Sequence, residues 1–338
     1  MPPPAVRVFH VSDEQAQQTL VTLLRQWLPG ESWSQVRKLL TARHIQVNGN
    51  LCLDEGRRLK AKDVVRILDN SQATPPKDAD VKIRYMDQHI VIVEKPAGMT
   101  TLRHAEERDW PTRRKQVQPT LDEVLPKVIA LQDKSRHTKG KGTGTGTGTG
   151  KKPPRVRAVH RLDRETSGLM VFARTPEAEQ KLVQMFRKHD MHRQYVAIVQ
   201  GRLEAQTITS NLVRDRGDGK RGSTTLKDVG QHAVTHVKPI EYLHGYTVVE
   251  CQLETGRTHQ IRIHLSELGH VLCGEKVYHT PLFQKAIPDH SGASRIALHA
   301  AELGLTHPIT GEPMHFKMQM PPDMAELLKR LRAKSATK

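Results

Sequence analysis

Asp163 is the side chain of this sequence best placed for acid–base or nucleophilic chemistry. It lies in VRAVHRLDRETSGLMVFART, residues 156–175, a stretch that also carries Arg157, Arg161, Arg164 and Arg174. Neighbouring arginines favour the ionised form of a carboxyl group, so the stretch predicts a carboxylate that can serve as nucleophile or base. A surface salt bridge or an Asx turn would also account for the pattern, and this stretch alone does not separate these interpretations.

The charge balance indicates a polyanionic partner. Lys and Arg outnumber Asp and Glu by 53 to 36, which gives the 338-residue chain a formal net charge of +17. Such an excess favours nucleic-acid binding, although a basic surface that only aids solubility would have the same composition. Only 4% of the residues are aromatic, so we expect few stacking surfaces.

Cysteine and histidine spacing predicts neither a disulfide framework nor a metal site. The three cysteines show no C-x-x-C spacing. A second group, His259, His264, His270 and Cys273, is separated by five, six and three residues, which does not match the i, i+4 pair of a helical zinc site. The chain also lacks a signal-like apolar start and any run of about 18 apolar residues, so we expect a cytoplasmic protein without a membrane span.

Residues 15–70 are predicted to form a small α/β module. Ser32 and Gln35 resemble a capping box, and Trp33, Val36, Leu39 and Leu40 then recur at helical spacing. The following HIQVNGNLCL has Asn-Gly between two alternating apolar runs, which is typical of a β-hairpin. We therefore expect a short basic helix followed by a hairpin.

A second, larger domain is predicted over residues 81–325, after a proline-containing linker at 71–80. Residues 134–152, KSRHTKGKGTGTGTGTGKK, form a low-complexity insertion that we expect to be a mobile loop. Apolar runs predict strands at 82–86, 89–99, 169–174, 194–201 and 246–255, with helices after Thr175-Pro176 and within 256–270. This order favours an α+β fold with a large mixed sheet.

The N-terminal module is similar to the RNA-binding domain named after small-subunit ribosomal protein S-four. The resemblance rests on SWSQVRKLLTARHIQVNGNLCLDEGRRLKAKDVVRIL, residues 32–68. It implies that the helix and hairpin present basic groups to structured RNA, and it nominates Arg37, Lys38 and Arg43 as contacts. The alternative is that these three residues are only the solvated face of a helix.

Three further motifs resemble the RluA-type pseudouridine synthases. They are HRLDRETSG (160–168), GRTHQIRIHLSELGH (256–270) and RIALHAAELGLTHPITGE (295–312), in the family's order and spacing, within a resemblance that covers about residues 80–322. The resemblance implies an enzyme that isomerises uridine in RNA to pseudouridine without a cofactor or metal. It leaves open whether the aspartate adds covalently or acts through a glycal intermediate.

The same resemblance assigns roles to four side chains. Asp163 is expected to be the catalytic carboxylate, Tyr195 to pack on the target base, and Arg262 to form an ion pair with Asp163. Arg161 is expected to enter the RNA stack where the target nucleotide flips out, since the vacated position must be filled. The chain departs from the family pattern at Arg193, Glu94 and Glu275, of which the latter two are expected to lie outside the catalytic set.

Large-subunit ribosomal RNA is the expected substrate, because family members with this N-terminal module mostly act on it. A tRNA substrate is the enzymatic alternative. A ribosome-assembly factor that binds RNA without catalysis is the other alternative, against which the intact Asp163, Tyr195 and Arg262 argue. We expect the protein to act as a monomer.

Overall fold

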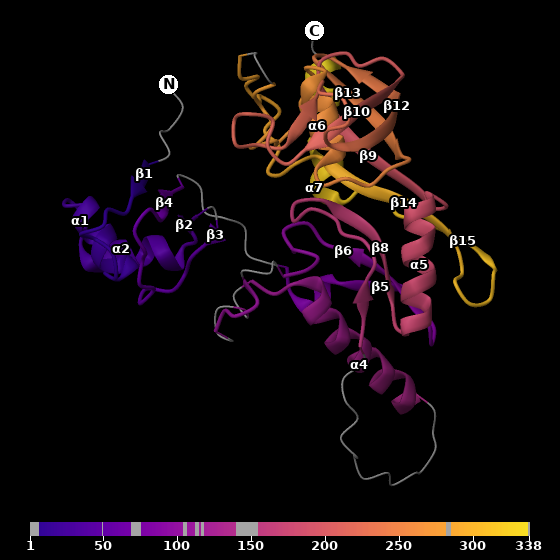
Figure 1. Ribbon diagram of the computed structural model, residues 1–338, viewed down its shortest axis with the longest axis horizontal. Helices are drawn as coiled ribbons and strands as arrows, with labels where there is room; N and C mark the ends of the chain where they lie inside the picture. Colours follow the sequence, from indigo (N-terminus) through magenta and orange to yellow (C-terminus); the bar gives the residue numbers. More distant parts are fainter. Residues whose placement is uncertain are drawn as a thin grey trace. The chain divides into compact units, whose positions relative to one another are not determined.

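The chain divides into two compact units, each with its own sheet (Figure 1). The computed structural model describes residues 7–48, 50–68, 76–103, 107–111, 115, 118–139, 155–281 and 285–336. Most of the glycine-threonine insertion, from residue 140 onward, lies outside the described residues, as does part of the predicted linker. No helix among the described residues is long and apolar enough to cross a membrane.

The N-terminal unit is a four-stranded antiparallel sheet with two helices. Its elements are β1 Arg7–His10, α1 Leu20–Trp27, α2 Trp33–Thr41, β2 Ile45–Val47, β3 Asn50–Leu51 and β4 Val64–Ile67. The strand order is β1-β4-β2-β3. The unit therefore begins earlier than residue 15, because β1 pairs with β4 along its whole length. The described residues between 107 and 118 also group with it, through contacts such as Gln118 Nε2 to the Leu51 carbonyl, 2.8 Å.

Helix α2 forms as its sequence predicts, with one difference in its buried face. The Gln35 amide donates to Ser32 Oγ (3.2 Å), and the Ser32 amide donates to Gln35 Oε1 (2.6 Å), which completes the capping box. Val36 and Leu40 are buried in the core of this unit. Trp33, which shares their helical spacing, is 47% exposed, and its neighbours Ser34 and Gln35 at the start of α2 are exposed as well.

The second unit is built on an eleven-stranded sheet. Its strands are β5 Lys82–Met86, β6 Ile90–Lys95, β7 Arg157–Ala158, β8 Ser167–Ala173, β9 His192–Gln200, β10 Gln206–Val213, β11 Gly222–Thr224, β12 Gln231–Leu243, β13 Tyr246–Leu253, β14 Leu298–Thr306 and β15 Pro313–Lys317. The order is β11-β10-β12-β13-β9-β14-β8-β6-β5, with β15 paired to β14 and β7 to β8. Strand β14 runs parallel to β8 and antiparallel to β9 and β15, so the sheet is mixed.

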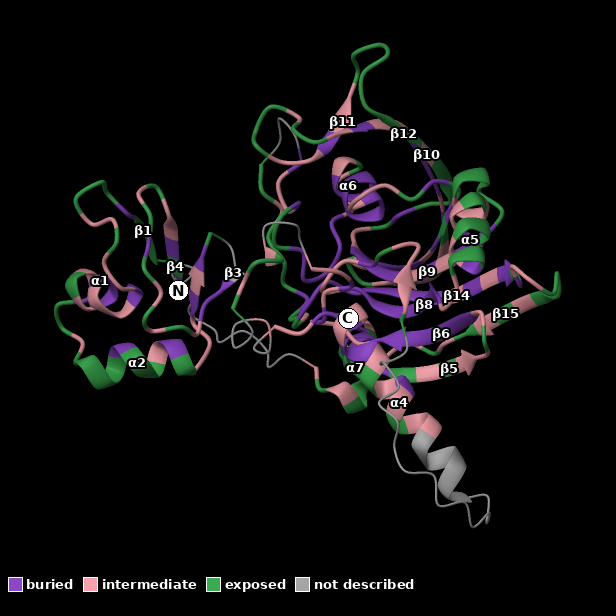
Figure 2. Cartoon of the chain, turned by 60° about the horizontal axis from the view of Figure 1, so that its bottom comes forward, coloured by how far each residue is buried: buried purple, intermediate pink, exposed green. Residues whose placement is uncertain are grey.

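Helices cover both faces of this sheet (Figure 2). They are η1 Asp78–Asp80, α4 Leu121–Lys139, α5 Pro176–Lys188, α6 Gln260–Glu267 and α7 Pro322–Ala336. The main core joins α4 and α6 to Val93, Phe172 and Ala197, and a second core joins α5 to Ile92 and Val171. The alternation along β6 and β8 therefore sends successive side chains to different cores.

The α+β fold and the predicted strands are confirmed, and the second unit extends beyond residue 325. Thr175 caps α5 and Pro176 begins it, as the sequence predicts. Helix α7 continues to Ala336 because Met324, Leu327 and Leu331 pack into a further core.

Candidate active site

The loop that carries Asp163 is fixed by hydrogen bonds on both sides of this residue. Thr101 Oγ1 donates to the Leu162 carbonyl (2.8 Å) and accepts from the Leu162 amide (3.1 Å). The Thr166 amide donates to the Asp163 carbonyl (3.1 Å), which closes the turn before β8. The Asp163 backbone is therefore held before any substrate arrives, as a catalytic group requires.

Lys95, at the end of β6, anchors the other side of this loop. Its ammonium is completely buried and donates to the carbonyls of Met99 (2.7 Å), Pro96 (3.0 Å) and Arg164 (3.1 Å). Burial lowers the pKa of Lys95 to about 7, while the charge of Asp163 opposes that shift. The lysine thereby links the turn after β6 to the loop that carries Asp163.

Arg262 contacts Asp163 directly, in the ion pair that the resemblance implies. Arg262 Nη1 lies 3.1 Å from Asp163 Oδ2, although 99 residues separate them in the chain. Arg262 belongs to α6, whose residues Gln260 to Ser266 are all buried. The Arg262 side chain is 7% exposed and that of Asp163 is 17% exposed, so the carboxylate can be reached while its partner is enclosed.

Glu275 holds Arg262 in place through contacts that the sequence did not predict. Its two carboxylate oxygens accept from Arg262 Nε and Nη2, both at 2.8 Å. Glu275 Oε1 also accepts from the amides of Lys276 (3.0 Å) and Val277 (2.8 Å). The arginine is therefore clamped in a planar fork that leaves Nη1 for Asp163.

The charges of this clamp are stabilised against burial. Burial by itself would raise the pKa of Glu275, but the hydrogen bonds and charge of Arg262 outweigh it and the pKa is lowered. Burial would likewise lower the pKa of Arg262, but Glu275 and Asp163 together raise it. Both groups therefore stay ionised, and Arg262 balances two carboxylates at once.

His259 and Tyr278 also line the site, and sequence reasoning gave them no role there. His259 Nε2 lies 3.7 Å from Asp163 Oδ1, and its Nδ1 lies 2.7 Å from the Tyr278 hydroxyl. His259 takes the left-handed conformation, with φ of 60°, immediately before α6. Burial lowers the pKa of His259, with Asp163 opposing the shift. A signal was present, because His259 lies in the same motif as Arg262.

Tyr195 lies on β9 and is buried in the core that also contains Leu162, the neighbour of Asp163. Burial raises the pKa of Tyr195, the charge of Arg193 opposes this, and the charge of Asp163 adds to it. The hydroxyl therefore keeps its proton at neutral pH and can donate a hydrogen bond. At 8% exposure, only a small part of the residue is open to a ligand.

The arginines near Asp163 in sequence have other partners, which corrects the expectation that they manage its charge. Arg157 pairs with Glu179 of α5 at 3.0 Å. Arg164 donates to the Gly98 carbonyl at 3.1 Å, and Arg174 donates to the Asp87 carbonyl. These three arginines contact other parts of the fold, and the ion-pair partner of Asp163 comes from α6 instead.

Arg161 differs from these three arginines. Its side chain is exposed, two residues before Asp163, and it has no ion pair with any residue in the part of the chain that the structure describes. This position is compatible with the predicted entry into an RNA stack.

The three nominated residues of the N-terminal unit have different environments. Arg37 is exposed but pairs with Glu55 at 3.1 Å. Lys38 is exposed on α2, and Arg43 is half-buried with φ of 68° just after the helix. Arg37 and Lys38 are thus both exposed, whereas Arg43 is half-buried.

The histidines considered for metal binding are engaged in hydrogen bonds. His264 contacts the hydroxyls of Thr235 and Ser210, both at 2.9 Å, and His270 Nδ1 lies 3.0 Å from the Gln200 carbonyl. The rings of His264 and His270 therefore contact different parts of the structure.

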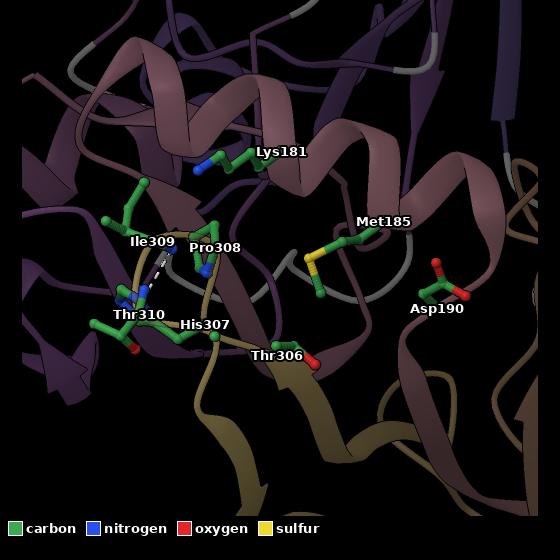
Figure 3. A pocket seen from close by; sticks show the side chains of 9 residues that line it. Lys181, Met185, Asp190, Thr306, His307, Pro308, Ile309 and Thr310 are labelled. Atoms are coloured by element: carbon green, nitrogen blue, oxygen red, sulfur yellow. Dashed lines mark hydrogen bonds between the residues drawn. The ribbon is translucent and has the colours of Figure 1, made fainter.

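A hollow of about 690 Å³ lies between α5 and the turn that follows β14 (Figure 3). Lys181, Met185, Asp190 and residues 306–311 line it, and none of them contacts Asp163. His307 closes the turn, since its Nδ1 accepts from the Thr310 amide (3.0 Å) and its Nε2 lies 2.7 Å from Asp87 Oδ2. This hollow is separate from the Asp163 site.

The large mixed sheet of the second unit is also found in solved structures of other proteins. The structure is similar to that of human RNA pseudouridylate synthase domain containing 4, with a TM-score of 0.55 and 23% identity over 74% of this chain and 92% of that one. Human RNA pseudouridylate synthase domain containing 1 gives a TM-score of 0.51 and 20% identity over 77% of this chain and 97% of that one. These likenesses establish the fold.

The family follows from sequence comparison. Residues 89–267 match the family described as RNA pseudouridylate synthase, and residues 18–65 match the S4 domain. The chain belongs to the RNA pseudouridylate synthase family and is an RNA pseudouridine synthase with an N-terminal S4 domain.

Curated relatives match most of the chain. Ribosomal large subunit pseudouridine synthase D of Xanthomonas campestris is 31% identical, covering 86% of this chain and 83% of its own length. The protein of the same name from Zymomonas mobilis is 34% identical, covering 84% of both chains. That of Escherichia coli K12 is 30% identical, covering 96% of this chain and 93% of its own length.

Proposed function

We propose that this enzyme isomerises uridines of large-subunit ribosomal RNA to pseudouridine, with Asp163 as the catalytic carboxylate. The observation that carries the assignment is the clamp of Asp163, Arg262 and Glu275 on a loop fixed by Thr101 and Lys95. The substrate follows from the relatives, which are named for the large ribosomal subunit, and from the S4 domain. A ribosomal substrate also implies action in the cytoplasm, and we propose that the monomer suffices.

Asp163 acts as an ionised carboxylate in this proposal. Its Oδ2 is paired with Arg262, while Oδ1 is 3.7 Å from His259, so Oδ1 is the less constrained oxygen. A carboxylate held by a buried guanidinium keeps its charge when RNA displaces water from the site, because the partner charge remains beside it. Such a group is suited to attack or to proton abstraction, and unsuited to general-acid catalysis.

Tyr195 and Arg161 act on the target nucleotide rather than on the carboxylate. The protonated hydroxyl of Tyr195 donates a hydrogen bond, and its ring edge packs on the uracil after the base leaves the helix. Arg161 fills the position that the base vacates. Arg37, Lys38 and Arg43 supply phosphate contacts that are independent of sequence.

The test is the substitution Asp163→Asn, which keeps the size of the side chain and removes its charge. Pseudouridine formation on large-subunit rRNA fragments under single-turnover conditions is expected to fall by at least about 10³-fold, as with the loss of an essential catalytic group. RNA binding at fixed salt is expected to persist, because the basic surface is unchanged. Asp190→Asn is the matched control, since Asp190 is exposed and remote in sequence from the motif.

Three results would change the assignment. Conversion by Asp163→Asn at the parental rate would make the carboxylate structural. Pseudouridine mapping in total RNA from a deletion strain would redirect the substrate if the missing sites were in tRNA. Parental protein that binds rRNA but converts no RNA would favour an assembly factor.

A further inference from the structure

Three adjacent strands bring two imidazoles and a carboxylate together on one face of the large sheet. In the register of β9, β14 and β15, Gly304 lies opposite both His192 and His315. Glu302 precedes Gly304 by two residues on β14, so its side chain leaves the same face. The three side chains are therefore neighbours, although 123 positions separate His192 from His315 in the chain.

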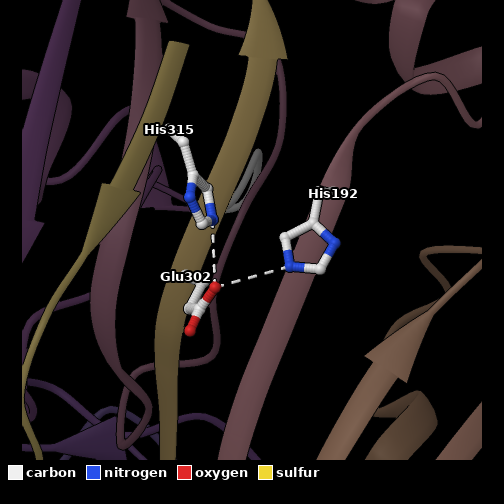
Figure 4. A group of neighbouring side chains, drawn as sticks. All are labelled: His192, Glu302 and His315. Atoms are coloured by element: carbon white, nitrogen blue, oxygen red, sulfur yellow. Dashed lines mark ion pairs between the residues drawn. The ribbon is translucent and has the colours of Figure 1, made fainter.

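The side chains point toward one another (Figure 4). His315 Nε2 lies 3.0 Å from Glu302 Oε2, and His192 Nε2 lies 3.6 Å from the same oxygen. Ligand atoms of the three residues all lie within 4.8 Å of one another. Two ligands of one Zn²⁺ ion lie roughly 3.4 Å apart in a tetrahedral site, so small side-chain rotations would complete the geometry.

Gly304 leaves open the space between the two rings. A Cβ atom at this position would lie 3.0 Å from His192 Cβ and 3.4 Å from His315 Cδ2. The backbone of Gly304 does not have positive φ, so the glycine is not required by conformation. What its missing side chain provides is room for the two imidazoles to converge.

One carboxylate oxygen of Glu302 is paired with a lysine, and the other faces the two imidazoles. Lys317 Nζ lies 2.9 Å from Glu302 Oε1, so that Oε2 is the oxygen that faces the two histidines. Lys317 is 67% exposed and can move aside for an incoming cation.

We propose that His192, Glu302 and His315 bind a Zn²⁺ ion on the exposed face of the sheet, with water as the fourth ligand. Two imidazoles and one carboxylate are a ligand set that Zn²⁺ accepts. The ion ties the edge strand β15 to β14 and β9. Because side chains alternate along β9, His192 lies on the opposite face from Tyr195, so the ion takes no part in pseudouridine formation.

The experiment measures Zn²⁺ binding to the untagged full chain after treatment with a chelator. Titration calorimetry is expected to show one Zn²⁺ per chain. Co²⁺ in place of Zn²⁺ is expected to give the visible absorption of a four-coordinate site. The double variant His192→Ala/His315→Ala is expected to bind Zn²⁺ more than about 100-fold more weakly, beyond the loss that outer-shell partners cause. Turnover of the parental enzyme is expected to be the same with and without Zn²⁺.

A matched control removes two histidines elsewhere. His244 and His290 are exposed and outside this cluster, so His244→Ala/His290→Ala is expected to bind Zn²⁺ as the parent does. Equal weakening in both double variants would mean binding to surface histidines in general, and would overturn the site. Absence of saturable binding by the parent would overturn it as well, as would undiminished binding by His192→Ala/His315→Ala. Thermal unfolding of each variant without metal shows that it remains folded.

Discussion

Replacing Glu275 by glutamine tests whether the clamp on Arg262 positions Asp163, the proposed catalytic carboxylate. Glu275 Oε1 accepts from three backbone amides and from Arg262 Nη2, so the amide oxygen of glutamine must take this place. Its NH₂ group then faces Arg262 Nε, which is a donor as well. One charge-assisted hydrogen bond is lost, at a cost of about 1.5–3 kcal/mol, and Arg262 moves relative to Asp163.

The expected consequences differ for turnover and stability. A displacement of about 1 Å in a positioned group can cost roughly 10²-fold in rate, so single-turnover pseudouridine formation by Glu275→Gln is expected to fall by about that factor. Breaking a buried ion pair costs about 3–5 kcal/mol, and a loss of about 3 kcal/mol lowers the Tm of a domain of this size by about 6–12 °C. RNA affinity is expected to be unchanged, since Glu275 is buried.

Glu204→Gln is the matched control for this experiment. It removes the same charge from a side chain that is 64% exposed, so turnover and Tm are expected to stay near the parental values. Parental turnover by Glu275→Gln with a lowered Tm would refute the positioning role and leave Glu275 purely structural. An unchanged Tm would refute the buried clamp itself.

Three further predictions concern other parts of the molecule. Tyr195→Phe keeps the ring and removes the hydroxyl, so RNA binding is expected to persist while turnover falls; parental turnover would exclude a role for the hydroxyl. Arg37→Ala/Lys38→Ala is expected to reduce the salt dependence of RNA binding by about 0.7–0.9 in log–log slope for each phosphate that the variant no longer neutralises, and an unchanged slope would remove these residues from the interface. Burial lowers the pKa of His264 from 6.5 to about 4, so its contribution to stability is complete above pH 6.5 and is lost as pH falls toward 4. The free energy of unfolding, measured with urea, is therefore expected to decline less steeply between pH 6.5 and 4 in His264→Gln than in the parent. An identical decline in both proteins would contradict the lowered pKa.

Much of the fold, and the pairing of Asp163 with Arg262, could be predicted from the sequence. Apolar runs predicted β6, β8, β9 and β13, because each strand buries one or both faces against a core regardless of its partner. Ser32 and Thr175 predicted helix starts, since capping needs only residues within one turn. The motifs carrying Asp163 and Arg262 identified the two charges, which the structure brings to 3.1 Å.

The tertiary structure decided which side chain completes the pair of Asp163 and Arg262 that the resemblance implied. Glu275 clamps Arg262, although the sequence gave no reason to include it. The sequence also did not predict the exposure of Trp33 or the proximity of His192 and His315. Periodicity states which face of an element is buried, but the order and register of strands are set by packing over the whole sheet, and it is register that puts distant side chains within bonding distance.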